Sequence, residues 1–265
     1  MTDASLQDDS PQDGIRARLC PLIPPEDILV RFDRTLIERM YRAGISSRFG
    51  RWELVDGLIV DACDPGRPHE GDAGNWYRTS RGNRLIPFDR EILELMENAG
   101  ILDDLGRCEL EDGVMIRMSP SLSPHGKAFS YLNALIVNAL GDRFTLASDT
   151  MLFLKEKDMR APDITVVPDE TPDGFFEPKD VLLCIEIASA SLDKDMTTKA
   201  VEYARHGIPE YWVVDLPNRL LHIHRAPGPA GYSTITSQGW EETVHPHCAP
   251  DVAIRPADQL DRVIR

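Results

Sequence analysis

The chain has 265 residues, 42% of them hydrophobic, and a formal net charge of −15 from 44 acidic and 29 basic side chains. Such a composition can bury a core as one domain with an extension or as two small domains. The acidic balance argues against a protein that holds nucleic acid through bulk positive charge. It leaves room for a nuclease whose carboxylates gather metal while a local basic strip or a second subunit holds the strand.

Targeting and redox signals are few. The sequence holds no run of 18 apolar residues and begins with the polar, acidic stretch "MTDASLQDDSPQDG". We therefore expect a soluble, cytoplasmic protein without membrane contact. Its five cysteines are scattered and never form a CxxC pair, which fits a reducing compartment. The cluster "HPHC" at 245–248 lacks a second pair of soft ligands, and we interpret it as a loop rather than a metal site.

Residues 1–31 are rich in Pro and Asp, and we expect a disordered or extended arm. A duplication follows, because residues 32–69 align without gaps on residues 88–125 and 16 of the 38 aligned residues are identical. Two copies are too few for a repeat array. We therefore expect that one copy belongs to the functional domain and that the other is an addition.

Each copy predicts a helix followed by a β-hairpin. Apolar residues at helical spacing precede a glycine that can end the helix, Gly44 or Gly100. The dipeptides at 56–57 and 112–113 are both Asp-Gly, which favours a type I′ turn because both central residues need positive φ. The first copy then runs into a glycine-rich loop, so we assign 32–87 to a helix-hairpin extension and 88–265 to the main domain.

The main domain alternates helices with strands. An apolar face over 126–142 predicts a helix, and so does the stretch 193–207. Strands are predicted over 144–155 (strand or hairpin), 162–168, 181–188, 209–216, 219–225 and 232–237. A helix between two buried strands indicates a parallel crossover, so the fold class is α/β or α+β with a mixed β-sheet flanked by helices.

Two carboxylates fall where apolar residues are expected. Glu186 lies inside the strand "VLLCIEIA", and Asp163 opens the preceding strand directly after Pro162. A buried carboxylate costs several kcal/mol unless it is paired or bound to metal. A structural ion pair is one interpretation. We favour a pocket of hard oxygen ligands for a divalent cation such as Mg²⁺.

Lys199 has two interpretations. It follows Asp195 by four residues and shares a helix face with Tyr203. The pair can lie in solvent and contribute a few tenths of a kcal/mol, or the face can turn toward Glu186 and supply positive charge at a phosphate.

Glu109 and His125 are similarly ambiguous. A hairpin glutamate is ordinarily solvated, and a histidine after proline at a helix start is ordinarily a cap. The first copy keeps the same residue types at the same separation, Glu53 and His69, which common origin also explains.

Several separated motifs resemble one known family. They are "GRCELEDGVMIRMSPSLSPH", "APDITVV" and "VLLCIEIASASLDKDMTTKAVEYARHGIPEYWVVDL", in this order. The region from about 88 to 260 resembles the Uma-two family of endonucleases, a branch of the PD-(D/E)XK restriction-endonuclease-like fold. The resemblance implies a mixed sheet flanked by helices and a Mg²⁺- or Mn²⁺-dependent nuclease acting on DNA.

The resemblance also implies an active site. Its residues would be Asp163, Glu186 and the upstream Glu109, with Lys199 on the next helix in place of the lysine that the wider superfamily carries at the position of Ala188. Asp163 and Glu186 would hold the metal together with the Ile187 carbonyl. Accessory roles would fall to His125, Asp195 and Tyr203.

We weigh three functions against these features. The first is a divalent-metal-dependent endonuclease, and the alternative is a catalytically inactive interaction module on a nuclease fold, since fold does not fix function. A hydrolase with a Ser or Cys nucleophile is disfavoured, because Cys184 and Ser189 lack a glycine-rich elbow and a histidine partner. A two-fold homodimer is compatible with the sequence, which contains no feature that requires one.

Overall fold

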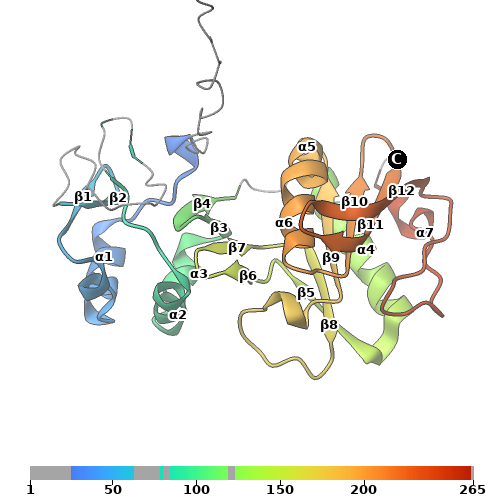
Figure 1. Cartoon of the computed structure of the whole chain (residues 1–265), viewed down its shortest axis with the longest axis horizontal. Coiled ribbons are helices and arrows are strands. Elements are labelled where there is room, and N and C mark those ends of the chain that lie inside the picture. The colour runs from blue at the N-terminus through green and yellow to red at the C-terminus, as the bar shows by residue number, and fades with distance from the viewer. Residues whose placement is uncertain (1–24, 63–77, 80, 82–83, 119–122, 264–265) are drawn as a thin grey trace, which may run out of the picture.

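The computed structural model describes residues 25–62, 78–79, 81, 84–118 and 123–263. The chain forms two duplicated helix-hairpin units at one end and a larger body with a central sheet at the other (Figure 1). Residues 1–24 of the expected arm and His69 lie outside the described residues. Within the rest of the expected arm, Glu26–Ile28 form a short 3-10 helix, and Leu29 and Val30 are buried.

The two copies fold alike. The first contains helix α1 (Arg34–Arg42), a 3-10 turn (Ile45–Phe49) and strands β1 (Trp52–Val55) and β2 (Leu58–Asp61). The second contains α2 (Arg90–Asn98), α3 (Ile101–Leu105), β3 (Cys108–Glu111) and β4 (Val114–Arg117).

Local sequence explains where these elements start and turn. The Asp33 carboxylate accepts from the Leu36 N–H at the start of α1, and the corresponding Asp89 caps α2; such caps stabilise a helix by about 1 kcal/mol. Both Asp-Gly turns have positive φ at each central residue, 51° and 81° in the first copy and 46° and 84° in the second. The expected type I′ conformation is confirmed.

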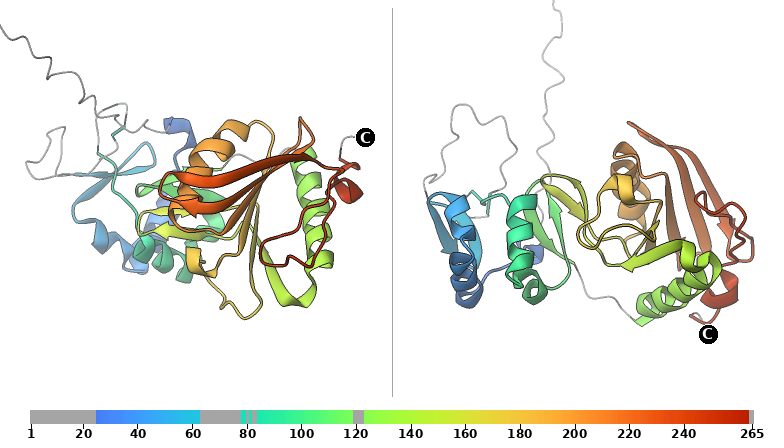
Figure 2. Two further views of the ribbon diagram at one scale, coloured as in Figure 1. Left: turned by 45° about the vertical axis from the view of Figure 1, so that its right-hand side comes forward. Right: turned by 90° about the horizontal axis from the view of Figure 1, so that it is seen from below.

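The segment that precedes each copy pairs with a strand of the other copy. Ahead of the first copy, the Val30 N–H donates to the Met115 carbonyl of β4. Ahead of the second, the Ile86 N–H donates to the Ile59 carbonyl of β2. Val30 and Ile86 are equivalent residues, 56 positions apart, and so are Ile59 and Met115. The pairing is therefore reciprocal. The two copies therefore pack around a pseudo-two-fold axis and lie side by side (Figure 2).

The interface between the copies has an apolar core. Phe32 and Phe88, which are equivalent residues, stack with ring centroids 5.5 Å apart and planes 7° apart. A smaller cluster is made of three equivalent pairs, Leu29 and Leu85, Leu58 and Val114, and Val60 and Ile116. Burial of these matching side chains against each other stabilises the pair.

The larger body is built on a mixed six-stranded sheet of order β12-β11-β10-β9-β8-β5. Its strands are β5 (Phe144–Ser148), β8 (Ile164–Pro168), β9 (Leu183–Ala188), β10 (Glu210–Asp215), β11 (Leu220–Gly228) and β12 (Gly231–Gly239). Strands β9 and β10 are parallel and the other pairs are antiparallel. The crossover between β9 and β10 runs through α5 (Leu192–Lys194), a π-helical turn (Asp195–Lys199) and α6 (Ala200–Arg205). The expected mixed sheet with a parallel crossover is confirmed.

Helices cover both faces of this sheet. On one face, α4 (Ser123–Leu140) packs against β9, in a cluster with Leu183, Ile185 and Ile187, and α7 (Ala257–Leu260) packs against α4. On the other face, α6 packs against Cys184 and Ala188. All six residues of β9 are buried, as expected for a central strand covered on both sides.

A second sheet, of order β4-β3-β7-β6, joins the second copy to the larger body. It includes β6 (Leu152–Lys155) and β7 (Asp158–Arg160). The expected strand or hairpin over 144–155 is two strands in different sheets, β5 and β6. No helix in the described part of the chain has the length and apolar character needed to cross a membrane.

Candidate active site

Asp163 and Glu186 lie side by side at the junction of β8 and β9. Ile164 pairs with Ile185 in the antiparallel ladder, so the residues that follow this pair toward the site are Asp163 and Glu186. The Asp163 Oδ2 accepts a hydrogen bond of 2.8 Å from the Ile187 N–H. Asp163 is 6% exposed and Glu186 is 4% exposed. The two carboxylates are thus presented from adjacent strands, as the sequence predicts.

Lys199 points into this site rather than into solvent. Its Nζ lies 2.8 Å from the Glu186 Oε1 and 3.6 Å from the Asp195 Oδ1, and the residue is 5% exposed. The π-helical turn that contains it buries both Asp195 and Lys199, and such turns recur at functional sites. Of the two interpretations of Lys199, the structure shows the inward one.

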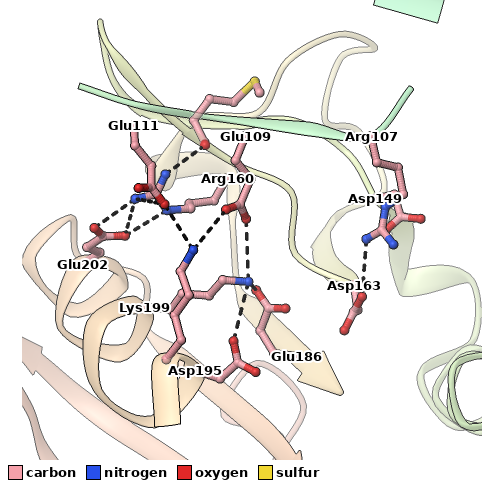
Figure 3. Close-up of polar contacts among 12 residues, drawn as sticks. Arg107, Glu109, Glu111, Asp149, Arg160, Asp163, Glu186, Asp195, Lys199 and Glu202 are labelled. Carbon is pink, nitrogen blue, oxygen red and sulfur yellow. Dashed lines mark hydrogen bonds and ion pairs between the residues drawn. The ribbon is translucent and has the colours of Figure 1, made fainter. Parts of the chain in front are cut away.

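Glu109 reaches the same lysine from the second sheet. It is 3% exposed, and its Oε1 lies 3.6 Å from the Lys199 Nζ. Burial alone would raise the pKa of this carboxyl, but Lys199, Arg160 and Lys194 together lower it. Figure 3 shows the lysine ammonium between Glu109 and Asp195, beside Glu186. Glu109 is therefore an ionised, buried group and not the solvated hairpin residue of the other interpretation.

Glu186 is held by two donors on one oxygen. The Tyr203 hydroxyl donates to the Oε1 at 3.0 Å, alongside Lys199. Burial raises the pKa of Glu186 to about 8, and the attraction of Lys199 offsets this only in part. Burial also disfavours the charged form of Lys199, yet the carboxylates around it outweigh this and raise its pKa. Lys199 is therefore the fixed cation of the site, and Glu186 is the acid that most readily takes up a proton.

His125 approaches Asp163 from the start of α4. Its Nε2 lies 3.1 Å from the Asp163 Oδ2, and this hydrogen bond raises the pKa of the imidazole. Burial would raise the pKa of Asp163, but His125 and the Ile187 N–H lower it. The predicted accessory residues His125, Asp195 and Tyr203 thus all contact one of the two strand carboxylates or Lys199.

Sequence reasoning missed four residues around the site. Arg107 contacts Asp149 and lies 3.5 Å from the Asp163 Oδ1, at the right of Figure 3. Lys194 lies 3.7 Å from the Glu109 Oε2, and the Arg160 guanidinium donates to the Leu110 carbonyl beside Glu109. Arg107 could have been found, because it is two residues before Glu109 and a strand places such residues on one face. Asp149, in a loop, gives no such signal.

Other candidate chemistry finds no support in the arrangement. In "HPHC", the His247 backbone N–H donates to Glu210 and the His245 carbonyl accepts from Arg225, so this segment is tied down as a loop. Burial raises the pKa of the Cys184 thiol well above its usual range, which removes the thiolate that a nucleophile needs.

The donor set fits a cation that keeps part of its water. Within the described ranges, no three His, Cys, Asp or Glu side chains gather closely enough to hold an ion by themselves. Mg²⁺ is commonly held by one or two carboxylates, with water and substrate phosphate oxygens completing its shell. Asp163 and Glu186 supply two such hard oxygen donors from a rigid pair of strands.

Comparison with known proteins gives one family match and similar solved structures. A family model named Uma2 and described as "Putative restriction endonuclease" matches residues 91–257, more than half of the chain. A crystal structure from Anabaena variabilis ATCC 29413, described as "a putative nuclease belonging to DUF820", is similar at 15% sequence identity and a TM-score of 0.49. That similarity covers 59% of this chain and 90% of the other. No curated protein matches the chain.

Proposed function

The chain belongs to the Uma2 family, and on this premise we propose that it is a divalent-metal-dependent endonuclease that hydrolyses DNA phosphodiester bonds. The proposal includes the restriction-endonuclease-like assignment of the mixed sheet. The observation that carries it is the buried pair Asp163 and Glu186 on adjacent strands, with the Lys199 ammonium 2.8 Å from Glu186. Two carboxylates and a cation in a buried cluster are parts that metal-assisted phosphoryl chemistry uses.

Asp163 and Glu186 would hold the cation, Mg²⁺ or Mn²⁺, together with the Ile187 carbonyl. When bound, the cation supplies polarisation of the phosphoryl oxygen and a lower pKa for water. Holding it favours the ionised form of Glu186, whose pKa is otherwise raised to about 8. Asp163 and Glu186 would therefore hold the cation with Glu186 deprotonated.

Lys199 would orient the attacking water or the scissile phosphate. Its ammonium is fixed by Glu186, Asp195 and Glu109, so it need not reorganise when negative charge develops on the phosphoryl group. Glu109 acts through Lys199 and is a positioning residue. His125 and the Ile187 N–H orient the Asp163 carboxylate through its Oδ2.

The strand would be held locally, because the whole chain is acidic. Arg107 is 31% exposed beside Asp163, and Lys194 is 46% exposed beside Glu109. These two cations border the buried carboxylates on different sides and can contact phosphates next to the scissile one. The proposed site thus combines an anionic interior with a cationic border.

A non-catalytic interaction module is the second candidate. It is favoured by Ala188 at the position of the usual superfamily lysine and by the engagement of both Asp163 oxygens, one by His125 and Ile187 and the other by Arg107. In this candidate the buried charges are a structural network.

Cleavage of DNA by the purified chain separates the two functions. Supercoiled plasmid and single-stranded DNA are incubated with Mg²⁺ or Mn²⁺, using wild type, Asp163→Ala and Glu186→Ala, with circular dichroism to confirm folding. We expect metal-dependent cleavage by wild type that falls at least about a hundredfold in both variants. Cleavage that survives both changes contradicts the assigned site, and a folded wild type without cleavage supports the interaction module.

A further inference from the structure

The first copy presents a strand edge that the second copy has filled. Strand β3 of the second copy pairs with β4 on one side and with β7 on the other, where Leu110 lies opposite Met159. Strand β1 has the same register with β2 as β3 has with β4. Among the described residues, no strand pairs with the other edge of β1.

Side-chain exposure shows the same difference. Leu54 is 40% exposed, whereas its equivalent Leu110 is fully buried in a cluster that includes Phe153 and Met159. Glu53 is exposed, whereas its equivalent Glu109 is 3% exposed. The second copy therefore shows what this edge accepts: a strand with an apolar side chain over the leucine and a cation near the glutamate.

In the second copy the cations that contact Glu109 are Lys199, at 3.6 Å, and Lys194, at 3.7 Å, and the paired strand β7 adds Arg160. Arg160 donates to the Leu110 backbone carbonyl at 3.0 Å and stabilises the ionised form of Glu109. The first copy keeps the leucine and the glutamate but replaces Cys108 with Trp52 and Glu111 with Val55. Its edge is thus more apolar than that of its twin and retains one acid.

We propose that the outer edge of β1 is a docking site for an extended strand of a partner polypeptide, with an apolar residue packed on Leu54 and an arginine that donates to the Leu54 backbone carbonyl beside Glu53. Exposed strand edges bind such segments through backbone hydrogen bonds, and side chains at alternate positions give specificity. This site is separate from the proposed nuclease centre and does not depend on it.

A second copy of the chain is a poorer occupant than a separate partner. The matching strand of any copy, β7, is already paired with its own β3, and its Arg160 is 2% exposed and bonded to Glu202. Two chains that each carry a net charge of −15 also repel one another. A basic, apolar strand from another protein meets neither obstacle.

The test uses a fluorescent peptide that copies residues 155–162 ("KEKDMRAP") as the probe. Its binding to the full chain is measured by anisotropy for wild type, Leu54→Lys and Glu53→Lys. The matched control is Tyr41→Lys, which changes a side chain that is 74% exposed on α1. A second peptide carries glutamate in place of its arginine.

We expect the peptide to bind wild type and Tyr41→Lys equally, and to bind the two β1 variants at least about tenfold more weakly. The glutamate peptide should bind wild type at least about tenfold more weakly as well. Absence of binding to wild type, or equal binding to wild type and Leu54→Lys, overturns the proposal. Sedimentation that shows a concentration-dependent dimer lost in Leu54→Lys would place a second copy on the edge and would also overturn it.

Discussion

At the scale of single residues, Lys199 is the centre of the candidate site. Its ammonium lies within 3.6 Å of carboxylate oxygens from Glu109, Glu186 and Asp195. These acids come from three separate elements, β3, β9 and the π-helical turn. An ammonium surrounded in this way compensates the burial of several negative charges at once, so its removal should affect stability as well as chemistry.

Lys199→Met should lower the free energy of unfolding by roughly 3–5 kcal/mol at pH 9, because it leaves buried carboxylates without a cation. The loss should be smaller at pH 5, since Glu186, with a pKa of about 8, is then protonated and no longer repels its neighbours. Urea denaturation at the two pH values measures both effects. The control is Lys194→Met, whose side chain is 46% exposed and should cost under about 1 kcal/mol; equal losses in the two variants would contradict a central role for Lys199.

The duplication provides a matched pair for catalysis. Glu109→Gln removes the charge that holds Lys199, and the rate of metal-dependent cleavage should fall by roughly ten- to a hundredfold. Glu53→Gln changes the exposed equivalent in the first copy and should leave the rate unchanged. Initial cleavage rates of the two variants and wild type decide the matter, and a larger loss in Glu53→Gln would show that the wrong copy was assigned.

The sequence predicts the two strand carboxylates because a charge inside an apolar strand is unusual enough to stand out. It leaves Lys199 undecided, since helical periodicity gives the face of a helix but not the direction in which that face turns. Asp149 is not predictable at all, because a loop aspartate joins the site only through tertiary folding. The roles of these residues in catalysis stay predictions.

At the scale of elements, strand β11 places an unsatisfied histidine in the core. His224 is fully buried, neither ring nitrogen has a hydrogen-bond partner among the described residues, and the ring stacks on Tyr232 and lies beside Tyr211. Burial lowers the pKa of His224 to about 4, with a smaller effect from His222. The folded state therefore keeps this imidazole neutral where the unfolded chain, with a pKa near 6.5, binds a proton.

His224→Phe should reduce the acid sensitivity of the fold. Between pH 6.5 and about 4 the unfolded state binds more protons at His224 than the folded state does. As the pH falls through this range, the difference lowers the free energy of unfolding of wild type by up to about 1.4 kcal/mol per pH unit. Phenylalanine removes this contribution and the two unpaired nitrogens. Denaturation midpoints at pH 7 and pH 4.5 measure the difference, and an unchanged gap between the two pH values in His224→Phe would exclude His224 as the cause.

Local pattern predicts elements better than it predicts their partners. The Asp-Gly turns and the buried strand β9 are readable because turn chemistry and apolar runs are local signals. The exchange of leading segments between the two copies is not readable, since it depends on pairing between residues far apart in sequence. For the same reason the division of residues 144–155 between two sheets could not be predicted.

At the scale of the whole molecule, the chain is acidic, but two partly exposed cations border the candidate site. The net charge is −15, while Arg107 and Lys194 lie next to the buried carboxylates with part of their surface exposed. The pseudo-two-fold pair of copies lies at the opposite end from the six-stranded sheet (Figure 1). Any strand of DNA must therefore be held by few contacts near the site rather than by the molecule as a whole.

Salt dependence should reflect those few contacts. The slope of log affinity against log salt for duplex DNA should be about −2 to −3, because two or three phosphates are neutralised. Anisotropy of labelled duplex, with Ca²⁺ in place of Mg²⁺, gives this slope. A slope of about −6 or steeper would mean that a larger basic surface than the border of Arg107 and Lys194 holds the DNA.

The most direct measurement is the initial rate of supercoiled-plasmid nicking as a function of Mg²⁺ concentration, for wild type, Glu186→Gln and the exposed-site control Glu53→Gln. Glutamine keeps the shape of the buried side chain but cannot supply a carboxylate to the cation. We expect saturable Mg²⁺-dependent nicking by wild type and Glu53→Gln and a rate at least about a hundredfold lower for Glu186→Gln at every Mg²⁺ concentration. Equal rates for wild type and Glu186→Gln would contradict a metal-dependent nuclease centred on this carboxylate.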